Sequence, residues 1–343
     1  MGEVDSKERS GMGEKLRVGV VGSGSWGTAI VKILFNNLEH INWWVREDEI
    51  IDNIKNFHHN HVYLSSVELP PEKLFLSKDI TEIIKRSDYL IFAIPSAFLY
   101  SPLKEISPDE FKGKTIISAI KGIVPEHNNI IADFFNSEYK VSFQDFVVVS
   151  GPSHAEEIAL EKLTYLTLAS QNTSRAEEAA KLFNCRYVKT SISDDIFGTE
   201  YSSVLKNVIA IANGICIGLG YGDNFQAVLI SNAIQEIKRF VDAVHPIDRD
   251  IKSSVYLGDL MVTAYSQFSR NRTFGNMIGK GYSVKFAQLE MKMIAEGYYA
   301  TKCIWSINKK YNVYMPITEA VYNILYEGKS PAREIQLLTE KLS

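Results

Sequence analysis

The sequence LRVGVVGSGSWGTAI (residues 16–30) joins a short apolar run to a glycine-rich loop and then to the start of a helical pattern. In a loop of this kind Gly22 permits a tight turn, Gly24 lets the backbone approach a pyrophosphate, and Gly27 lets the helix pack closely on the strand. The helix N-terminus then offers free amide groups to phosphates. A glycine turn without a ligand is the alternative, but the order of strand, loop and helix favours a dinucleotide site.

Similar apolar runs, rich in β-branched residues, alternate with helix-length stretches from Leu16 to about Ser193. This alternation is typical of βαβ units that build a parallel sheet. Five runs look buried on both faces because polar residues hardly interrupt them, and they span residues 16–21, 41–45, 89–94, 115–120 and 146–150. Two more runs, 164–170 and 185–191, are expected to add outer strands. The sequence therefore predicts a Rossmann-type α/β dinucleotide-binding domain over residues 16–193.

The second half of the chain has a different pattern. Stretches 201–219, 226–244 and 286–307 are long and carry apolar residues at three- and four-residue spacing, which predicts helices. We therefore expect an all-helical (all-α) substrate and catalytic domain over residues 194–343. The polar residues 1–15 lie outside both predicted domains and are expected to form a disordered N-terminal extension.

Composition narrows the classes of function. The net charge is −4, without the basic surface typical of a nucleic-acid binder. No apolar run approaches the ~18 residues of a membrane-spanning helix, and the polar first fifteen residues lack a secretory signal, so the sequence predicts a cytoplasmic protein. Cys185, Cys216 and Cys303 have neither metal-site spacing nor the density of a disulfide framework. We expect reduced thiols and no metal.

The end of the second predicted strand should lie near the nucleotide ribose, since an acidic residue usually stands about 20 residues beyond the glycine loop. Here that end reads Trp44-Val45-Arg46, with Glu47 and Asp48 directly after it. Arg46 could stack on an adenine or meet a 2′-phosphate, and an exposed arginine at a strand end can equally be a plain surface charge. The pattern leaves the choice between NAD and NADP open.

Several longer strings, spread over most of the chain, match one family in that family's order. They are GSGSWGTA (22–29), DYLIFAIPS (88–96), IKG (120–122), SGPSHAEEIA (150–159), LKNVIAIANGICIGLGYGDN (205–224), GDLMVTAYSQFSRNRTFG (258–275) and AEGYYATK (295–302). The chain resembles the NAD(P)-dependent glycerol-3-phosphate dehydrogenases, most closely the bacterial type. The resemblance implies reversible reduction of dihydroxyacetone phosphate to sn-glycerol 3-phosphate, which supplies the backbone for glycerophospholipid synthesis. By analogy it also suggests a homodimer.

The resemblance implies a set of site residues as well. Lys206 corresponds to the general acid/base, and Lys121 and Asp259 complete the catalytic group. Implied substrate contacts are Lys121, Gly151, Ser153, Lys206, Asp259, Ser269, Arg270 and Asn271. Expected cofactor contacts are Gly22, Gly24, Ser25, Trp26, Gly27, Arg46, Lys121, Ala155, Arg270, Ile294 and Glu296. Lys121 and Arg270 are in both sets, so we expect them where nicotinamide and substrate meet.

The sequence departs from the family pattern at three places. The family usually has an aromatic residue where this chain has His154, and commonly an arginine where it has Asn232. It usually has a Gly-x-Gly-Asp-Leu turn where this chain reads Tyr256-Leu257-Gly258-Asp259-Leu260. We interpret the first and third departures as local repacking. Asn232 leaves open whether that position serves phosphate binding or helix packing.

The residue types fit the chemistry. Reducing a ketone needs a hydride, which the cofactor supplies, and a proton, which a lysine can supply if its pKa falls well below ~10.4. Burial and a second cation both lower the pKa of a lysine, and Lys121, just beyond a predicted strand end, is the natural second cation. Lys206 lies in an apolar helical stretch, where its charge is costly unless partnered; a side chain that reaches water along the helix is the alternative.

The other polar candidates also have plain structural alternatives. Asp259 follows a glycine and precedes an apolar run, so it could cap a helix, or it could orient Lys206 and offset the positive charge. The string Ser269-Arg270-Asn271-Arg272 suits a phosphate dianion, and it could instead be a solvated basic turn. Two rival functions stay open: a β-hydroxyacid-type dehydrogenase with an unphosphorylated substrate, and a nicotinamide-binding regulator without turnover.

Overall fold

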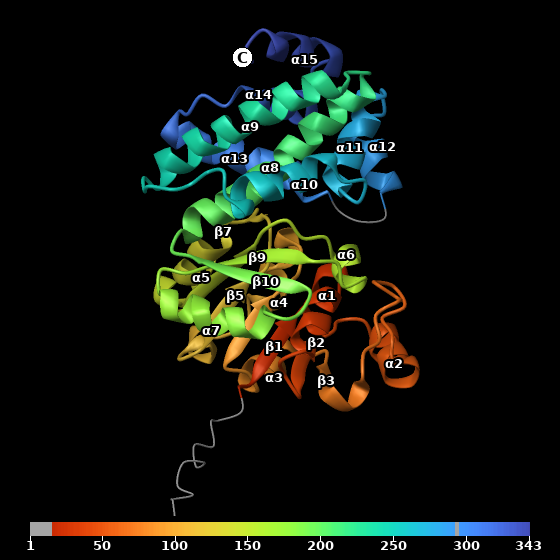
Figure 1. Ribbon diagram of the computed structural model, residues 1–343, viewed down its shortest axis with the longest axis vertical. Helices are drawn as coiled ribbons and strands as arrows, with labels where there is room; N and C mark the ends of the chain where they lie inside the picture. Colours follow the sequence, from red (N-terminus) through yellow and green to blue (C-terminus); the bar gives the residue numbers. More distant parts are fainter. Residues whose placement is uncertain (1–15, 292–294) are drawn as a thin grey trace, which may run out of the picture.

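In the computed structural model, which describes residues 16–291 and 295–343, the first predicted strand lies inside an eight-stranded sheet with the order β10-β9-β8-β5-β4-β1-β2-β3 (Figure 1). The strands are β1 (Val18–Val21), β2 (Ile41–Trp44), β3 (Leu74–Ser77), β4 (Tyr89–Phe92), β5 (Thr115–Ser118), β8 (Phe146–Ser150), β9 (Thr164–Ala169) and β10 (Val188–Ser193). A small hairpin pairs β6 (Ile123–Val124) with β7 (Asn129–Ile130). All seven predicted runs form strands, and β3 is an eighth that the sequence pattern did not predict.

The sheet is parallel from β3 to β8, and its two outer strands run the other way. β9 pairs antiparallel with β8, and β10 pairs parallel with β9. The link between β8 and β9, residues 151–163, holds only the short helix α6 (Ala155–Ala159). Alternating apolar runs predict the strands but not this reversal of direction.

Helices cover both faces of the sheet because its central strands are apolar on both sides. They are α1 (Ser25–Leu34), α2 (Asp48–Phe57), α3 (Ile80–Lys85), α4 (Tyr100–Leu103), α5 (Ile131–Tyr139) and α7 (Thr173–Phe183). Short 3₁₀ turns occupy Pro71–Lys73, Ser96–Phe98, Pro108–Phe111 and Phe143–Asp145. The sequence therefore folds as predicted into a Rossmann-type sheet part.

The rest of the chain is helical and lies above the sheet in Figure 1. Its elements are α8 (Ile196–Gly218), α9 (Asp223–Val244), a π-helical turn (Ser254–Gly258), α10 (Asp259–Tyr265), α11 (Arg270–Gly279), α12 (Val284–Glu290), α13 (Glu296–Tyr311), α14 (Pro316–Tyr326) and α15 (Pro331–Thr339). The predicted single helical stretch 286–307 is wrong, since it falls into α12 and α13. Met291 and Ala295 between them have extended backbone, and the apolar spacing that suggested one helix continues across the break.

The helix α8 is the centre of the helical part. It is long and apolar enough to cross a membrane, yet 89% of its apolar window is buried inside the protein, as in a core helix. Helix α11 packs directly against it. A side chain on Gly275 would overlap the backbone of Ile211, and one on Gly214 would overlap the backbone of Arg272. This backbone-to-backbone contact places the start of α11 beside the middle of α8.

One apolar cluster crosses from the sheet part into the helical part. It includes Phe92 and Phe135 from the first part together with Val204, Leu229 and Leu260 from the second. A second cluster fills the other face of the sheet, under α1, α2 and α7. The two parts therefore share a core, and the edge of the sheet from which β1, β4 and β5 lead into their loops faces the helices.

Candidate active site

The glycine loop follows β1 at the point where the strand order reverses between β1 and β4. Gly22 has a φ of 123°, and a side chain there would lie 2.6 Å from the carbonyl oxygen of Ala93. Gly24, by contrast, has no atom within 4 Å of where a side chain would project. The buried Nε1 of Trp26 has no hydrogen-bond partner among the described residues. An open backbone approach beside an unpartnered donor fits a dinucleotide pyrophosphate and its neighbours.

The end of β2 brings two charged residues to this loop. Glu47 accepts a hydrogen bond from Ser23 Oγ (3.1 Å) and pairs with Arg46 (2.6 Å). The Arg46 side chain is 70% exposed, so its position alone does not decide between the functional and the plain surface interpretation. Glu47 was not among the predicted site residues, although its spacing from the glycine loop is the signal that marks a ribose-binding acid.

Lys206 is buried and forms an ion pair with Asp259, with 2.5 Å between Nζ and Oδ1. The other carboxylate oxygen of Asp259 lies 3.4 Å from Nζ of Lys121 and accepts a hydrogen bond from Ser150 Oγ (3.3 Å). Lys206 thus does not reach water along its helix. The capping alternative for Asp259 is also wrong, because its carboxylate contacts these side chains and α10 begins with it. The π-helical turn before Asp259 carries it to this position.

The charges of these groups affect one another. Burial lowers the pKa of Lys206, the carboxylate of Asp259 opposes this and the positive charge of Lys121 adds to it, so that the pKa is about 7. Burial raises the pKa of Asp259, but the charges of Lys121 and Lys206 outweigh it and hold that pKa below its usual value. The site therefore holds a firmly ionised carboxylate beside a lysine that can lose its proton near neutral pH.

Lys121 connects this pair to the edge of the sheet. Its Nζ donates to the carbonyl oxygen of Gly151 (3.1 Å) and to Ser153 Oγ (3.3 Å), and it lies 5.9 Å from the centre of the Trp26 ring. Asn207 Nδ2 donates to the carbonyl oxygen of Lys121 (2.9 Å). Asn207 was also absent from the predicted site, although it directly follows Lys206 in sequence. Its hydrogen bond ties α8 to the loop that carries Lys121.

The predicted phosphate-binding string lies at the start of α11. Ser269 caps the helix by accepting from the backbone N–H of Arg272 (3.3 Å), and Asn271 Oδ1 accepts from the backbone N–H of Gly297 (2.9 Å). Burial raises the pKa of Glu296 more than the charges of Arg270, Lys121 and Lys206 lower it, so that the pKa is about 7. These charges are therefore close enough to influence one another. The predicted cofactor residue Ile294 lies outside the described residues.

Two of the three sequence departures are at His154 and Asn232. His154 stands between Ser153 and Ala155, its ring lies 5.9 Å from that of Phe268, and its buried Nε2 has no partner among the described residues. Burial lowers the pKa of His154, and the charges of Lys206 and Lys121 add to this. Asn232 exchanges hydrogen bonds with the backbone of Ser343, which identifies it as a packing contact of α9 with the end of the chain.

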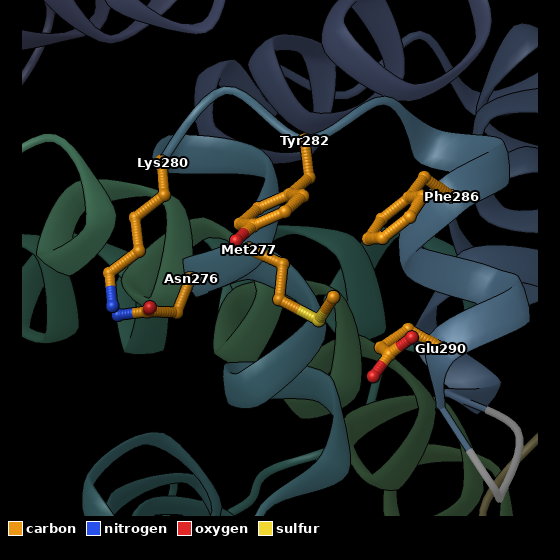
Figure 2. A pocket seen from close by; sticks show the side chains of 6 residues that line it. All are labelled: Asn276, Met277, Lys280, Tyr282, Phe286 and Glu290. Carbon is orange, nitrogen blue, oxygen red and sulfur yellow. The ribbon is translucent and has the colours of Figure 1, made fainter.

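A groove of about 300 Å³ lies at the opposite end of α11, away from the predicted site (Figure 2). It contains none of the predicted site residues and is lined by Asn276, Met277, Lys280, Tyr282, Phe286 and Glu290. In the described part of the chain, no group of three or more His, Cys, Asp or Glu side chains is arranged to hold a metal ion.

A Rossmann-type sheet with an open glycine loop, joined to helices that bury a lysine–aspartate pair at the sheet edge, defines a two-part nicotinamide-dependent dehydrogenase. Models of the "NAD-dependent glycerol-3-phosphate dehydrogenase" N-terminus and C-terminus match residues 17–176 and 195–336. The chain therefore belongs to the NAD-dependent glycerol-3-phosphate dehydrogenase family.

Individual relatives agree with this assignment. The chain is 36% identical over 327 residues to "Glycerol-3-phosphate dehydrogenase [NAD(P)+]" of Bacillus velezensis, covering 95% of this chain and 94% of the relative. It is 35% identical to the Bacillus subtilis protein of the same name, covering 94% and 93%. A crystal structure of glycerol-3-phosphate dehydrogenase from Coxiella burnetii superposes with a TM-score of 0.88 at 28% identity, covering 95% and 99%.

Proposed function

We propose that this chain catalyses the reversible NAD(P)-dependent reduction of dihydroxyacetone phosphate to sn-glycerol 3-phosphate, which supplies the backbone of glycerophospholipids. The observation that carries the proposal is the buried Lys206–Asp259 ion pair with Lys121 beside it, at the sheet edge where the glycine loop opens. The names of the relatives support the substrate. The proposal includes a division near residue 193 into a nucleotide-binding and a substrate domain.

In this proposal the residues divide the chemistry between them. When bound, the nicotinamide supplies the hydride. Lys206 gives its proton to the developing alkoxide, which a pKa of about 7 allows near neutral pH. Asp259 holds Nζ of Lys206 in place through their ion pair. Lys121 places a second positive charge that polarises the carbonyl oxygen.

The phosphate of the substrate is assigned to the start of α11. Helix N-termini favour anions, and α11 begins with Arg270, whose guanidinium suits bidentate phosphate recognition. Ser269 and Asn271 flank it, and the hydrogen bond from Gly297 to Asn271 fixes this turn against α13. Because the chain as a whole carries a net charge of −4, an anionic substrate has to be attracted by such local cations.

The cofactor is assigned to the glycine loop and its surroundings. Its pyrophosphate would lie over Gly24 and the start of α1, and its ribose near Arg46 and Glu47. Trp26, Ala155, Glu296 and Lys121 would surround the nicotinamide. Ser25, Gly22, Gly27, Arg270 and Ile294 complete the proposed cofactor set, and Gly151 and Ser153 complete the substrate set. A cytoplasmic location and a homodimeric state are further parts of the proposal, which cell fractionation and light scattering would test.

The decisive experiment compares NADH and NADPH oxidation with dihydroxyacetone phosphate and with unphosphorylated dihydroxyacetone. We expect turnover with the phosphorylated ketone, and a KM that rises by about tenfold or more in the Arg270→Lys variant, because lysine cannot form the bidentate contact. Equal turnover of both ketones would favour the β-hydroxyacid type of dehydrogenase. A folded protein that binds cofactor but oxidises none of it would instead be a nicotinamide-binding regulator.

A further inference from the structure

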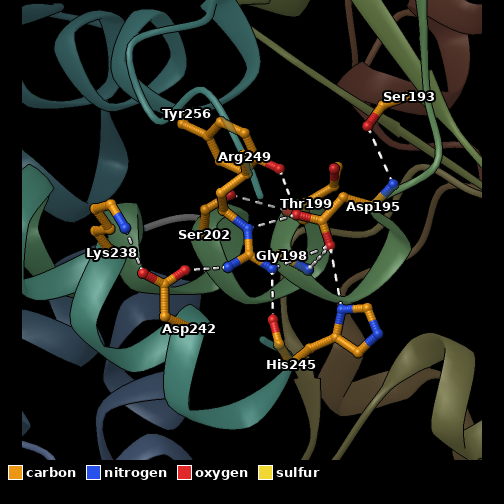
Figure 3. Close-up of polar contacts among 10 residues, drawn as sticks. All are labelled: Ser193, Asp195, Gly198, Thr199, Ser202, Lys238, Asp242, His245, Arg249 and Tyr256. Atoms are coloured by element: carbon orange, nitrogen blue, oxygen red, sulfur yellow. Dashed lines mark hydrogen bonds and ion pairs between the residues drawn. The ribbon is translucent and has the colours of Figure 1, made fainter. Parts of the chain in front are cut away.

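A second buried charge cluster lies at the start of α8, in the helical part and apart from the groups proposed for chemistry (Figure 3). We call it the Asp195 cluster; it consists of Asp195, Asp242, Arg249 and Tyr256. Asp195 Oδ2 accepts hydrogen bonds from the hydroxyl of Tyr256 (2.6 Å) and from Nε of Arg249 (2.8 Å). Its Oδ1 accepts from the backbone N–H of Gly198 (2.9 Å), so Asp195 also caps α8.

The arginine of this cluster brings in the end of α9. Arg249 forms an ion pair with Asp242 and donates from Nη2 to the carbonyl oxygen of His245 (2.7 Å). The side chains of Asp195 and Arg249 are 3% and 2% exposed. Removing two charges from water is costly, so such a pair persists only where other hydrogen bonds satisfy it. Here three chain segments supply those bonds: the start of α8, the end of α9 and the turn with Tyr256.

Tyr256 links this cluster to the proposed catalytic aspartate. It lies in the π-helical turn, and that turn ends at Gly258, directly before Asp259. π-Helical turns are rare and frequent at functional sites. Side chains on a helix tilt toward its N-terminus, so Lys206 points back toward the end of α8 that Asp195 caps. Two contacts therefore fix the same short segment to α8: Tyr256 with Asp195, and Asp259 with Lys206.

The sequence singles out Tyr256 as well. It stands where the family pattern usually has the first glycine of a Gly-x-Gly-Asp-Leu turn. A glycine has no hydroxyl to donate to Asp195, so this hydrogen bond depends on the tyrosine of this chain. We propose that Tyr256, acting through Asp195, is a positioning residue that aligns Asp259 with Lys206. The proposal rests on the function proposed above.

The test is the Tyr256→Phe variant, which removes one hydroxyl from the Asp195 cluster. Tyr139→Phe is the matched control, because Tyr139 is equally buried and its hydroxyl donates to Leu103 in the sheet part. Two quantities are measured in the full chain: kcat and KM with dihydroxyacetone phosphate, and the titration of Lys206 by NMR of labelled lysines, assigned with Lys206→Arg. The NMR titration requires no turnover.

We expect Tyr256→Phe to lower kcat by about tenfold and to change KM by less than about threefold. Since Asp259 raises the pKa of Lys206, a looser ion pair moves the Lys206 titration to lower pH, by about half a unit or more. Tyr139→Phe should change neither quantity. An unchanged Lys206 titration in Tyr256→Phe, whatever its kcat, or an equal change in Tyr139→Phe, would overturn the proposal. A shifted titration in a chain without turnover would reject the proposed function alone.

Discussion

At the scale of single residues, burial decides what the proposed acid can do. A lysine in water keeps its proton far above neutral pH, and Lys206 does not, because the protein leaves it 4% exposed and places the cation of Lys121 nearby. Asp259 then has two effects. It keeps the pKa of Lys206 from falling further, and it holds the ammonium group in one place. The same carboxylate therefore tunes and orients the acid.

Replacing Lys206 with methionine should lower kcat by roughly 10²–10⁴-fold, because the general acid is lost. Binding of NADH should change little, since Asp259 keeps Lys121 as a partner. Steady-state kinetics and fluorescence titration of NADH measure the two effects. Lys114→Met is the control, because burial also lowers the pKa of Lys114 while its Nζ bonds Ser87 in the sheet part. Wild-type kcat in Lys206→Met would assign the proton to another group.

The pH dependence of kcat/KM should reflect Lys206. Ketone reduction needs the protonated lysine, so kcat/KM should fall as pH rises through about 7, and the reverse oxidation should rise over the same range. Initial rates between pH 6 and 9 in both directions would measure this. Because burial also raises the pKa of Glu296 to about 7, the Glu296→Gln variant is needed. In Glu296→Gln, kcat/KM should still fall with rising pH, but the fall should come at lower pH, because removing a nearby negative charge lowers the pKa of Lys206. If kcat/KM of Glu296→Gln no longer fell with rising pH, the titrating group would be Glu296 instead of Lys206.

Three residues that the sequence predicted for the site, Lys121 in IKG, Lys206 in LKN and Asp259 in GDL, lie together in the structure. Two neighbouring residues that the sequence did not predict, Glu47 and Asn207, are recognised only from the direction of their side chains. Glu47 contacts the glycine loop through Ser23, and Asn207 supports the backbone of Lys121. Sequence spacing places such residues near a site, but only the packed structure shows which atoms they meet.

At the scale of elements, two glycines of the glycine loop have different roles, one in folding and one in ligand binding. Gly22 is required by its positive φ and by the neighbouring backbone of Ala93. Gly24 has an ordinary φ of −69° and open space beside it. One glycine therefore serves the turn, and the other keeps a surface clear for a ligand.

Gly24→Ala should leave the midpoint of thermal unfolding unchanged, because alanine adopts this backbone conformation without contact. The same change should raise the Kd of NADH by about tenfold or more, because the methyl group occupies the approach of the pyrophosphate. Gly22→Ala should instead lower the melting temperature. Circular dichroism melts and fluorescence titration separate the two effects. Unchanged NADH binding in Gly24→Ala would show that the pyrophosphate lies elsewhere.

The elements were predictable where hydrophobic period and length agree, as in the buried strands and in α8 and α9. The strand β3, with the sequence LFLS, is only partly buried. The equally short strands β1, β4 and β5 are fully buried, and their apolar runs are therefore easier to recognise. The break between α12 and α13 contains no glycine or proline that would predict it, and apolar residues continue at helical spacing on both sides.

At the scale of the whole molecule, the shared apolar cluster joins the two parts more closely than their sequence patterns suggest. Phe92 and Phe135 of the sheet part belong to the same buried cluster as Val204 and Leu260 of the helical part. Length and periodicity indicate two units, but they carry no information about which units share a core. The packing of α8 over the sheet supplies that information.

We therefore expect the protein without ligands to unfold in one cooperative transition. The measurement is calorimetry, with a calorimetric enthalpy close to the van't Hoff enthalpy. A fragment covering residues 16–193 should be less stable than the sheet part of the full chain, because it exposes apolar side chains that α8 covers. Two well-separated transitions in the full chain would contradict this expectation.

The close contact between α8 and α11 also limits how this protein can change by insertion and deletion. Helix α8 is capped by Asp195 and carries Lys206, Asn207 and Gly214, the glycine against which α11 packs. Adding a single residue within α8 between Asn207 and Gly214 would turn one end against the other by roughly 100°. Lys206 and the start of α11 would then no longer face the same space. Enzyme engineers should therefore vary the surface loops and leave the length of α8 unchanged.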